Sequence, residues 1–288
     1  MHKYREILIL HPIDNSTKFL EPFKDSFGVN YYGFNSDTIY DVKAKLGDLE
    51  PKSLIVFIGH GSSRGLYEPD ERHIYEKYFL DEMWANHYFE DHDVILLCCR
   101  SNEFMRKINK ASCLIGFGNI ISSKRELDVH NENTEIKKNL SEEEIGLFNS
   151  YFVNSIIKTI KLLEDGKIAF KDVRKYISFF INKCIVNVLK DKTNCNRVEL
   201  ARLLFEFRDE IKYQNNVELF GMNYLVFKCE FVGLNLGLNF STQCNTMCNN
   251  NNQSSFFSNE LGASYCVVMS SVVGNLATAR NLLKNSCN

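Results

Sequence analysis

Two side chains that could act together in catalysis follow two apolar segments of the chain. Residues 54–59 are apolar or small and lead directly to His60, while residues 93–99, Asp-Val-Ile-Leu-Leu-Cys-Cys, end at Cys99. A cysteine thiolate is a strong nucleophile, and a histidine beside it can pass a proton to the leaving group. The pair therefore suggests acyl-transfer chemistry, provided that the fold brings the two side chains together.

The elements that must position this pair are short strands alternating with helices. We expect strands at residues 6–10, 29–34, 54–59, 93–99 and 111–118, with helices at residues 36–49, 78–89 and 101–109 between them. Short, wholly apolar strands separated by helices predict an α/β fold with a mostly parallel sheet covered on both faces. Parallel strands end at the same edge of a sheet, so His60 and Cys99 are expected to face one another across a small cleft.

The residues beside the pair suit the same chemistry. Gly61 leaves its amide unshielded, and the amides of Gly61 and Cys99 could bind the oxyanion of a tetrahedral intermediate. Ser101 opens the next helix, whose N-terminus would favour a thiolate at Cys99. Strand alternation points Cys98 to the opposite face, where we expect a small core residue.

The middle of the chain is predicted to be helical. Ser141 and Glu144 form a capping-box pattern, and apolar residues then follow at helical spacing as far as Leu163. Further helices are expected from about residue 168 and over residues 198–211, and a last strand over residues 216–221.

The order of these segments resembles the caspase-like cysteine proteases, and most closely the CHAT family. Residues 98–101, Cys-Cys-Arg-Ser, are similar to the sequence around the family nucleophile, and a His-Gly pair ends the preceding strand. Three later segments are similar as well: CLIGFGNI (113–120), FNSYFVNSIIKTIKLLEDGKIAFKDVRKY (148–176) and VELFG (217–221). The resemblance covers roughly residues 5–225.

This resemblance implies a caspase-like three-layer sandwich and a cysteine endopeptidase, a thiol protease of the hydrolase class. Cys99 would be the nucleophile, His60 the acid/base, and the Gly61 and Cys99 amides the oxyanion hole. It implies a protein or peptide substrate, no cofactor, control by an activating protein partner and a role of the prokaryotic defence or stress type. The alternative is a catalytically silent caspase-like scaffold that binds a protein partner.

Substrate choice depends on a charged insertion at residues 122–140. Its carboxylates follow the fifth strand, where a substrate-pocket wall could form, and they include Glu126 and Asp128. An acidic wall at these two residues would select a basic residue at the cleavage site. A merely hydrophilic insertion is the alternative and the commoner situation.

Composition narrows the classes of partner. The 288 residues carry a formal net charge of -2, which gives no basic field for nucleic acid. We find no signal peptide and no apolar run long enough to cross a membrane, and we interpret the ten cysteines as mostly reduced thiols of a cytoplasmic protein.

Other groupings carry less weight. His73, His87 and His92 lack the spacing of a metal-ligand motif, so a solvated helical face is expected and no metal site. Cys244 and Cys248 have no second ligand pair nearby.

The chain is expected to divide after Lys228. Residues 1–228 would form the caspase-like domain. Residues 229–288 would be an asparagine-rich tail of low charge and unknown fold, dispensable for the candidate pair.

Overall fold

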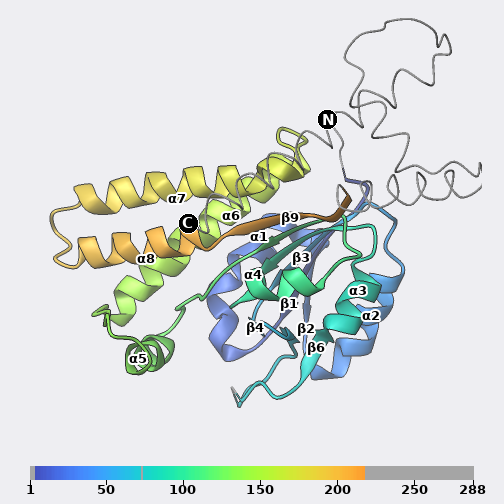
Figure 1. Ribbon diagram of the computed structural model, residues 1–288, viewed down its shortest axis with the longest axis horizontal. Coiled ribbons are helices and arrows are strands. Elements are labelled where there is room, and N and C mark those ends of the chain that lie inside the picture. The colour runs from blue at the N-terminus through green and yellow to red at the C-terminus, as the bar shows by residue number, and fades with distance from the viewer. Residues whose placement is uncertain (1–3, 73, 218–288) are drawn as a thin grey trace, which may run out of the picture. The chain divides into compact units, whose positions relative to one another are not determined.

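The computed structural model describes residues 4–72 and 74–217, which form a central sheet between two layers of helices (Figure 1). The sheet has the strand order β2-β1-β3-β7-β8-β9, and only β9 runs antiparallel to its neighbour. Its strands are β1 Ile7–Pro12, β2 Tyr31–Phe34, β3 Leu54–Ile58, β7 Asp93–Leu97, β8 Cys113–Gly116 and β9 Lys212–Asn215. The predicted mostly parallel α/β fold with helices on both faces is confirmed.

The strands that precede the candidate pair are neighbours, as expected. Strand β3 pairs with β7 in parallel, with Leu54 opposite Asp93 and Ile58 opposite Leu97. The chain leaves β1 toward β2 and returns to β3 on the other side of β1. The carboxyl ends of β1 and β3 therefore form a topological switch point, the place where open α/β sheets commonly bind ligands.

Successive side chains of the buried strands point to opposite faces of the sheet, and each face packs against one layer of helices. Leu54, Val56 and Ile58 contribute to one core cluster, and Ile55 and Phe57 contribute to the other. The first cluster includes residues of α1, α6, α7 and α8, and the second includes residues of α2, α3 and α4. The bounds are α1 Pro22–Phe27, α2 Ile39–Gly47, α3 Glu82–Tyr88, α4 Ser101–Phe104, α6 Glu142–Glu164, α7 Val173–Lys190 and α8 Arg197–Asp209.

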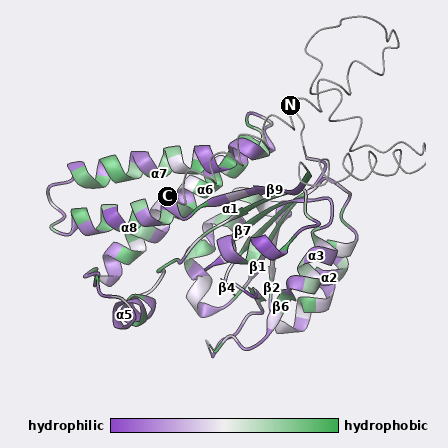
Figure 2. Cartoon of the chain, in the orientation of Figure 1, coloured by the Kyte–Doolittle hydropathy of each residue, from purple (hydrophilic) through white to green (hydrophobic). Residues whose placement is uncertain are grey.

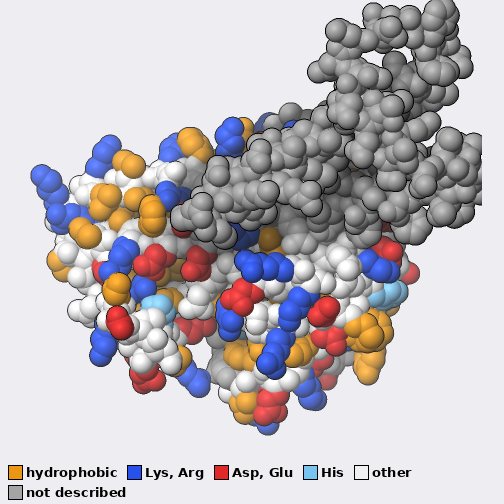
Figure 3. Space-filling view, viewed as in Figure 1, with side chains coloured by type: hydrophobic (Ala, Val, Ile, Leu, Met, Phe, Trp, Pro, Cys, Tyr) orange, Lys and Arg blue, Asp and Glu red, His pale blue; other side chains and the backbone are white. Residues whose placement is uncertain are grey.

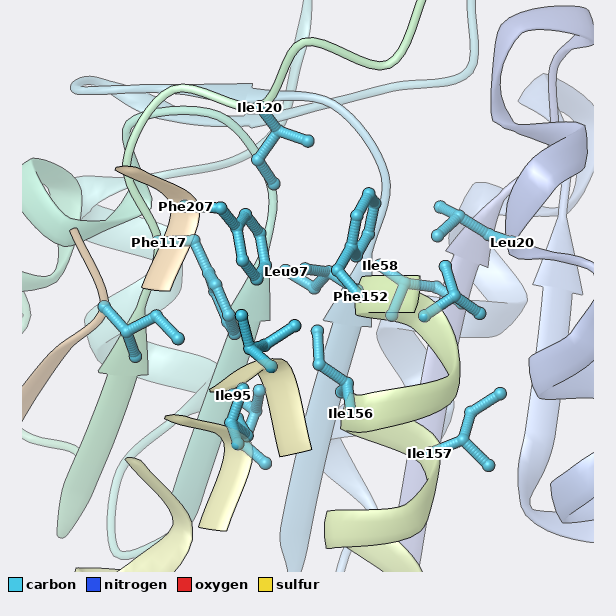
Figure 4. Packing of buried hydrophobic residues seen from close by; sticks show 14 of the residues in the cluster. Leu20, Ile58, Ile95, Leu97, Phe117, Ile120, Phe152, Ile156, Ile157 and Phe207 are labelled. Atoms are coloured by element: carbon cyan, nitrogen blue, oxygen red, sulfur yellow. The ribbon is translucent and has the colours of Figure 1, made fainter. Parts of the chain in front are cut away.

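Helix α6 closes the first core beneath the strand ends. Its predicted capping box is present: Ser141 accepts from the Glu144 amide, and the Glu144 carboxylate accepts from the Ser141 amide. Figure 4 shows Phe152 of α6 beside Ile58 and Leu97, the last residues of β3 and β7. Figure 2 shows hydrophobic residues along the central parallel strands and both kinds of residue alternating around the helices.

Two predicted elements were wrong in position or type. Residues 78–81 were expected in a helix, but they form strand β6 (Tyr78–Asp81) of a small antiparallel sheet with β4 (Gly61–Ser62) and β5 (Gly65–Tyr67). The helix begins only at Glu82, because the Asp81 side chain caps it by accepting from the Trp84 amide. The small sheet explains the run of small residues after His60, since a hairpin begins there.

The closing strand lies earlier than predicted. Strand β9 occupies Lys212–Asn215, whereas Asn216 and Val217 are helical and residues 218–221 lie outside the described residues. Its sequence, Lys-Tyr-Gln-Asn, is largely polar because β9 is the edge strand of the sheet as far as the described residues go, where it pairs with β8 alone. A search for apolar runs therefore passes over it.

The predicted boundary after Lys228 and the tail at residues 229–288 also lie outside the described residues. Within the part of the chain that is described, no helix is long and apolar enough to cross a membrane. Figure 3 shows basic and acidic side chains interspersed over the described surface on this face.

Candidate active site

His60 and Cys99 line the same small cavity at the carboxyl edge of the sheet. Its volume is about 20 Å³, and its walls come from the segments that follow β1, β3, β7 and β8, together with α6. The lining residues are Thr17, Phe19, Leu20, Gly59, His60, Leu97, Cys99, Ile120, Ser122, Glu126 and Phe152. His60 and Cys99 therefore line one cavity at the same edge of the sheet, and this cavity holds about one water molecule.

One nitrogen of His60 is bound to a network that the sequence analysis missed. His60 Nε2 lies 2.6 Å from Ser16 Oγ, which donates its proton to Asp14 Oδ1 at 2.6 Å. A hydroxyl has one proton to give, so Ser16 must accept from Nε2–H. In the neutral imidazole this leaves Nδ1 as the unprotonated nitrogen, able to accept a proton.

Asp14 is suited to anchor this network. It is 3% exposed, and its Oδ1 also accepts from the Ser16 and Thr17 amides, capping the 3-10 helix η1 (Asn15–Leu20). Burial alone raises the pKa of Asp14, but the His60 and Ser16 hydrogen bonds and the charge of His60 outweigh burial and lower it to about 2. The carboxylate therefore stays ionised, 3.8 Å from His60 Nε2. Its position just after the first predicted strand was the signal available in the sequence.

The Tyr75 ring packs against the imidazole of His60. Its ring centroid lies 4.3 Å from that of His60, and its hydroxyl is 3.0 Å from Ser16 Oγ. Because Ser16 gives its proton to Asp14, Tyr75 must be the donor in this contact. Asp70 holds the Tyr75 backbone at a φ of 53° by accepting from the amides of Ile74 and Tyr75. His60 is thus fixed by groups from two separate segments.

Cys99 faces the α6 side of the sheet, and Cys98 faces the other side, as alternation predicted. Cys98 is 1% exposed and belongs to the core cluster of α2, α3 and α4. The Cys99 thiol donates to the Ile120 carbonyl at 3.4 Å. Burial and, secondarily, the Glu126 carboxylate raise the pKa of Cys99 to about 12.

The expected activation of Cys99 by a helix N-terminus is therefore not observed in this structure. Helix α4 is a single turn, Ser101–Phe104, and its partial charge does not offset the burial of the thiol. Ser101 instead fixes the turn that carries Cys99: its buried hydroxyl donates to the Leu96 carbonyl at 2.6 Å and accepts from the Phe117 amide at 2.8 Å.

Gly61 lies where only a glycine fits. A Cβ at this position would lie 2.5 Å from Cys98 Sγ and 3.5 Å from the Cys99 carbonyl oxygen. The two backbones expected to form an oxyanion hole are therefore close neighbours. Packing against Cys98 is by itself a sufficient reason for glycine here.

The two predicted pocket carboxylates have different surroundings. Glu126, on α5 (Lys124–Glu132), lines the cavity of His60 and Cys99, and it accepts from the Ser122 amide at 2.6 Å and hydroxyl at 2.7 Å. Asp128 is absent from that lining and is largely exposed, 3.5 Å from Lys124 Nζ. Of the predicted acidic wall, the structure brings Glu126 to the site and leaves Asp128 outside it.

The histidines weighed as a metal cluster are separated in the described structure. His92 is 6% exposed and accepts from the Ser53 amide at 3.2 Å, so it does not belong to the solvated face that we expected. His87 is exposed on α3, and residue 73 lies outside the described residues. Within the described ranges, no group of three or more His, Cys, Asp or Glu side chains could hold a metal ion.

Comparison of the chain with protein-family models, with curated proteins and with solved structures found no match.

Proposed function

We propose that this chain is a cysteine endopeptidase that uses Cys99 as nucleophile and His60 as acid and base. The observation that carries the proposal is the shared cavity: both side chains line it, and they follow two adjacent parallel strands. The resemblance of the flanking segments to caspase-like proteases supports the same activity. The catalytic residues would then come from the segments that directly follow β3 and β7. The protein would be cytoplasmic and would have a role of the prokaryotic defence type.

The hydrogen bonds around His60 support a definite proton path. With Nε2–H donated to Ser16, Nδ1 accepts the thiol proton as Cys99 Sγ bonds to the substrate carbonyl carbon. The amides of Gly61 and Cys99 stabilise the resulting oxyanion. The imidazolium then protonates the leaving amine, the C–N bond breaks, and water hydrolyses the thioester. Asp14, ionised throughout, stabilises the imidazolium through Ser16.

Cleavage after a basic residue is the substrate preference that we propose. Glu126 is the acidic side chain of the cavity lining, and a lysine or arginine side chain would offer it a charged hydrogen-bond donor. Asp128 takes no part in this proposal, because it lies outside the cavity. Glu126→Gln should then reduce cleavage after lysine and arginine more than cleavage after neutral residues.

A peptide-library digestion tests the activity. The full chain is incubated with the library, with and without cell extract, because an activating protein partner is part of the proposal. Cys99→Ala and His60→Ala should each abolish processing, and Cys195→Ala, which removes an exposed thiol on a distant segment, should not. Undiminished cleavage by Cys99→Ala or His60→Ala contradicts the assignment.

A catalytically silent scaffold is the second candidate function. It is favoured by the high pKa of the Cys99 thiol and by a cavity of only about 20 Å³. The rate at which an acyloxymethyl-ketone probe labels each thiol distinguishes the two functions. In a protease, Cys99 is the thiol labelled fastest when the activator is present. Slow labelling of Cys99 under every condition would support the scaffold.

A further inference from the structure

The Cys99 thiol lies beneath the segment that follows β8, residues 118–122, which we call the cover. The Ile120 carbonyl accepts from Cys99 Sγ at 3.4 Å, and Ile120 and Ile121 are 7% and 3% exposed. Ile120 and Ser122 also line the cavity of about 20 Å³ that the thiol shares with His60. Cys99 is itself partly exposed, but a peptide side chain needs several times the space of this cavity. In this arrangement a substrate therefore cannot enter between Cys99 and His60.

The first part of the cover is fastened to the end of α8. The Asn119 amide donates to Glu210 Oε2 at 2.8 Å, and Glu210 directly follows that helix. Gly118 belongs to the same contact, because a Cβ there would collide with the Glu210 carboxylate. The carboxylate therefore rests directly on the backbone of the cover.

The last part of the cover is fastened to α6. Asn149 is 6% exposed on that helix, and its Nδ2 donates to the Ser122 carbonyl at 2.9 Å. Among the described residues its Oδ1 has no hydrogen-bond partner. A buried amide with an unpaired oxygen weakens a core, so good packing does not explain an asparagine here. Holding Ser122 does explain it.

We propose that residues 118–122 are an autoinhibitory cover, latched by Asn149 and Glu210, which must lift before Cys99 can meet a substrate. The inference deepens the proposed function and rests on it for its biological purpose. Lifting the cover would admit water to the Cys99 thiol and so relieve the burial that is the main cause of its raised pKa, which favours the thiolate. Asn149 lies on α6 and Glu210 directly follows α8. A movement of either helix would therefore loosen the cover by breaking one of these two hydrogen bonds.

The test measures how fast iodoacetamide alkylates Cys99 in the full-length chain, located by mass spectrometry. Glu210→Ala removes the latch, and Glu210→Gln is the matched control because its amide oxygen can still accept from Asn119. We expect alkylation about tenfold faster in Glu210→Ala, since losing a hydrogen bond to a charged group shifts an equilibrium by about that factor. Gly118→Ala, which pushes the carboxylate away, should give a similar increase, and Glu210→Gln should stay near wild type. The exposed Cys195 serves as the internal standard.

The outcomes separate this inference from the proposed function. Faster Cys99 alkylation without peptide cleavage, even with extract, supports the cover and contradicts the protease. Unchanged alkylation in the folded Glu210→Ala and Gly118→Ala variants overturns the cover, whatever the activity. If Glu210→Ala does not melt cooperatively, Asn149→Leu replaces it, since leucine fills the same space without a donor, and the same rate criterion applies.

Discussion

The buried histidine of β1 should make the stability of this chain depend on pH in a definite window. His11 is 1% exposed, and its Nδ1 lies 2.6 Å from the Tyr31 hydroxyl. Burial lowers the pKa of His11 from 6.5 to about 4; the nearby Asp14 carboxylate opposes this shift and His60 adds to it. The folded chain therefore keeps His11 neutral at pH values where the unfolded chain protonates it.

The sign and size of the effect follow from these pKa values. Above pH 6.5 neither state binds the proton, so the stability due to the neutral imidazole is complete. As the pH falls from 6.5 toward 4, the unfolded chain alone takes up a proton, and stability declines. Each unit of difference between the unfolded and folded pKa corresponds to about 1.36 kcal/mol, so the free energy of unfolding falls by about 3 kcal/mol once the pH is well below both values. Asp14, with its folded-state pKa near 2, stays ionised in the folded chain throughout this window.

Urea unfolding followed by circular dichroism at pH 7.5 and 4.5 measures the decline. Wild type should lose about 2 kcal/mol more than His11→Phe over that interval, part of the full effect. His87→Gln, which removes an exposed histidine of α3, should behave like wild type. Equal losses in wild type and His11→Phe would refute the reasoning, because they would mean that His11 titrates alike in both states.

Three further predictions concern the core, a helix cap and the orientation of His60. Phe152→Ala should lower the free energy of unfolding by about 3–5 kcal/mol, because this ring is fully buried and stacks on Phe207; a loss below 1 kcal/mol in urea unfolding would contradict the packing described. Ser141→Ala should cost about 1 kcal/mol through the lost cap, and an unchanged urea midpoint would show that α6 does not need it. Ser16→Ala should lower kcat of the proposed peptidase by about tenfold or more and change its pH profile, with KM little affected. An unaltered pH profile would mean that Ser16 does not orient the imidazole.

The residues before the candidate pair show how far local pattern could predict the site. Buried parallel strands must be apolar on both faces, so β3 and β7 are visible as short apolar runs, and their ends locate His60 and Cys99. Alternation likewise separated Cys98 from Cys99. The Ser141 cap could be predicted because a capping box involves residues only three apart.

Other features depend on partners far apart in the sequence. Strand β6 was mistaken for helix because its pairing with β5 is not visible in a single segment. Glu126 and Asp128 are two residues apart, yet only the fold decides that one lines the cavity and the other points to Lys124.

Apolar periodicity and strand alternation are local properties, and they were enough to predict the mostly parallel sheet and the strand ends that carry His60 and Cys99. The hydrogen-bond partners of these two side chains, by contrast, come from segments far away in the sequence and become visible only in the folded chain. Ser16 reaches His60 across 44 residues, and the Ile120 carbonyl reaches Cys99 across 21. The burial that raises the Cys99 pKa likewise comes from packed layers that no single segment contains.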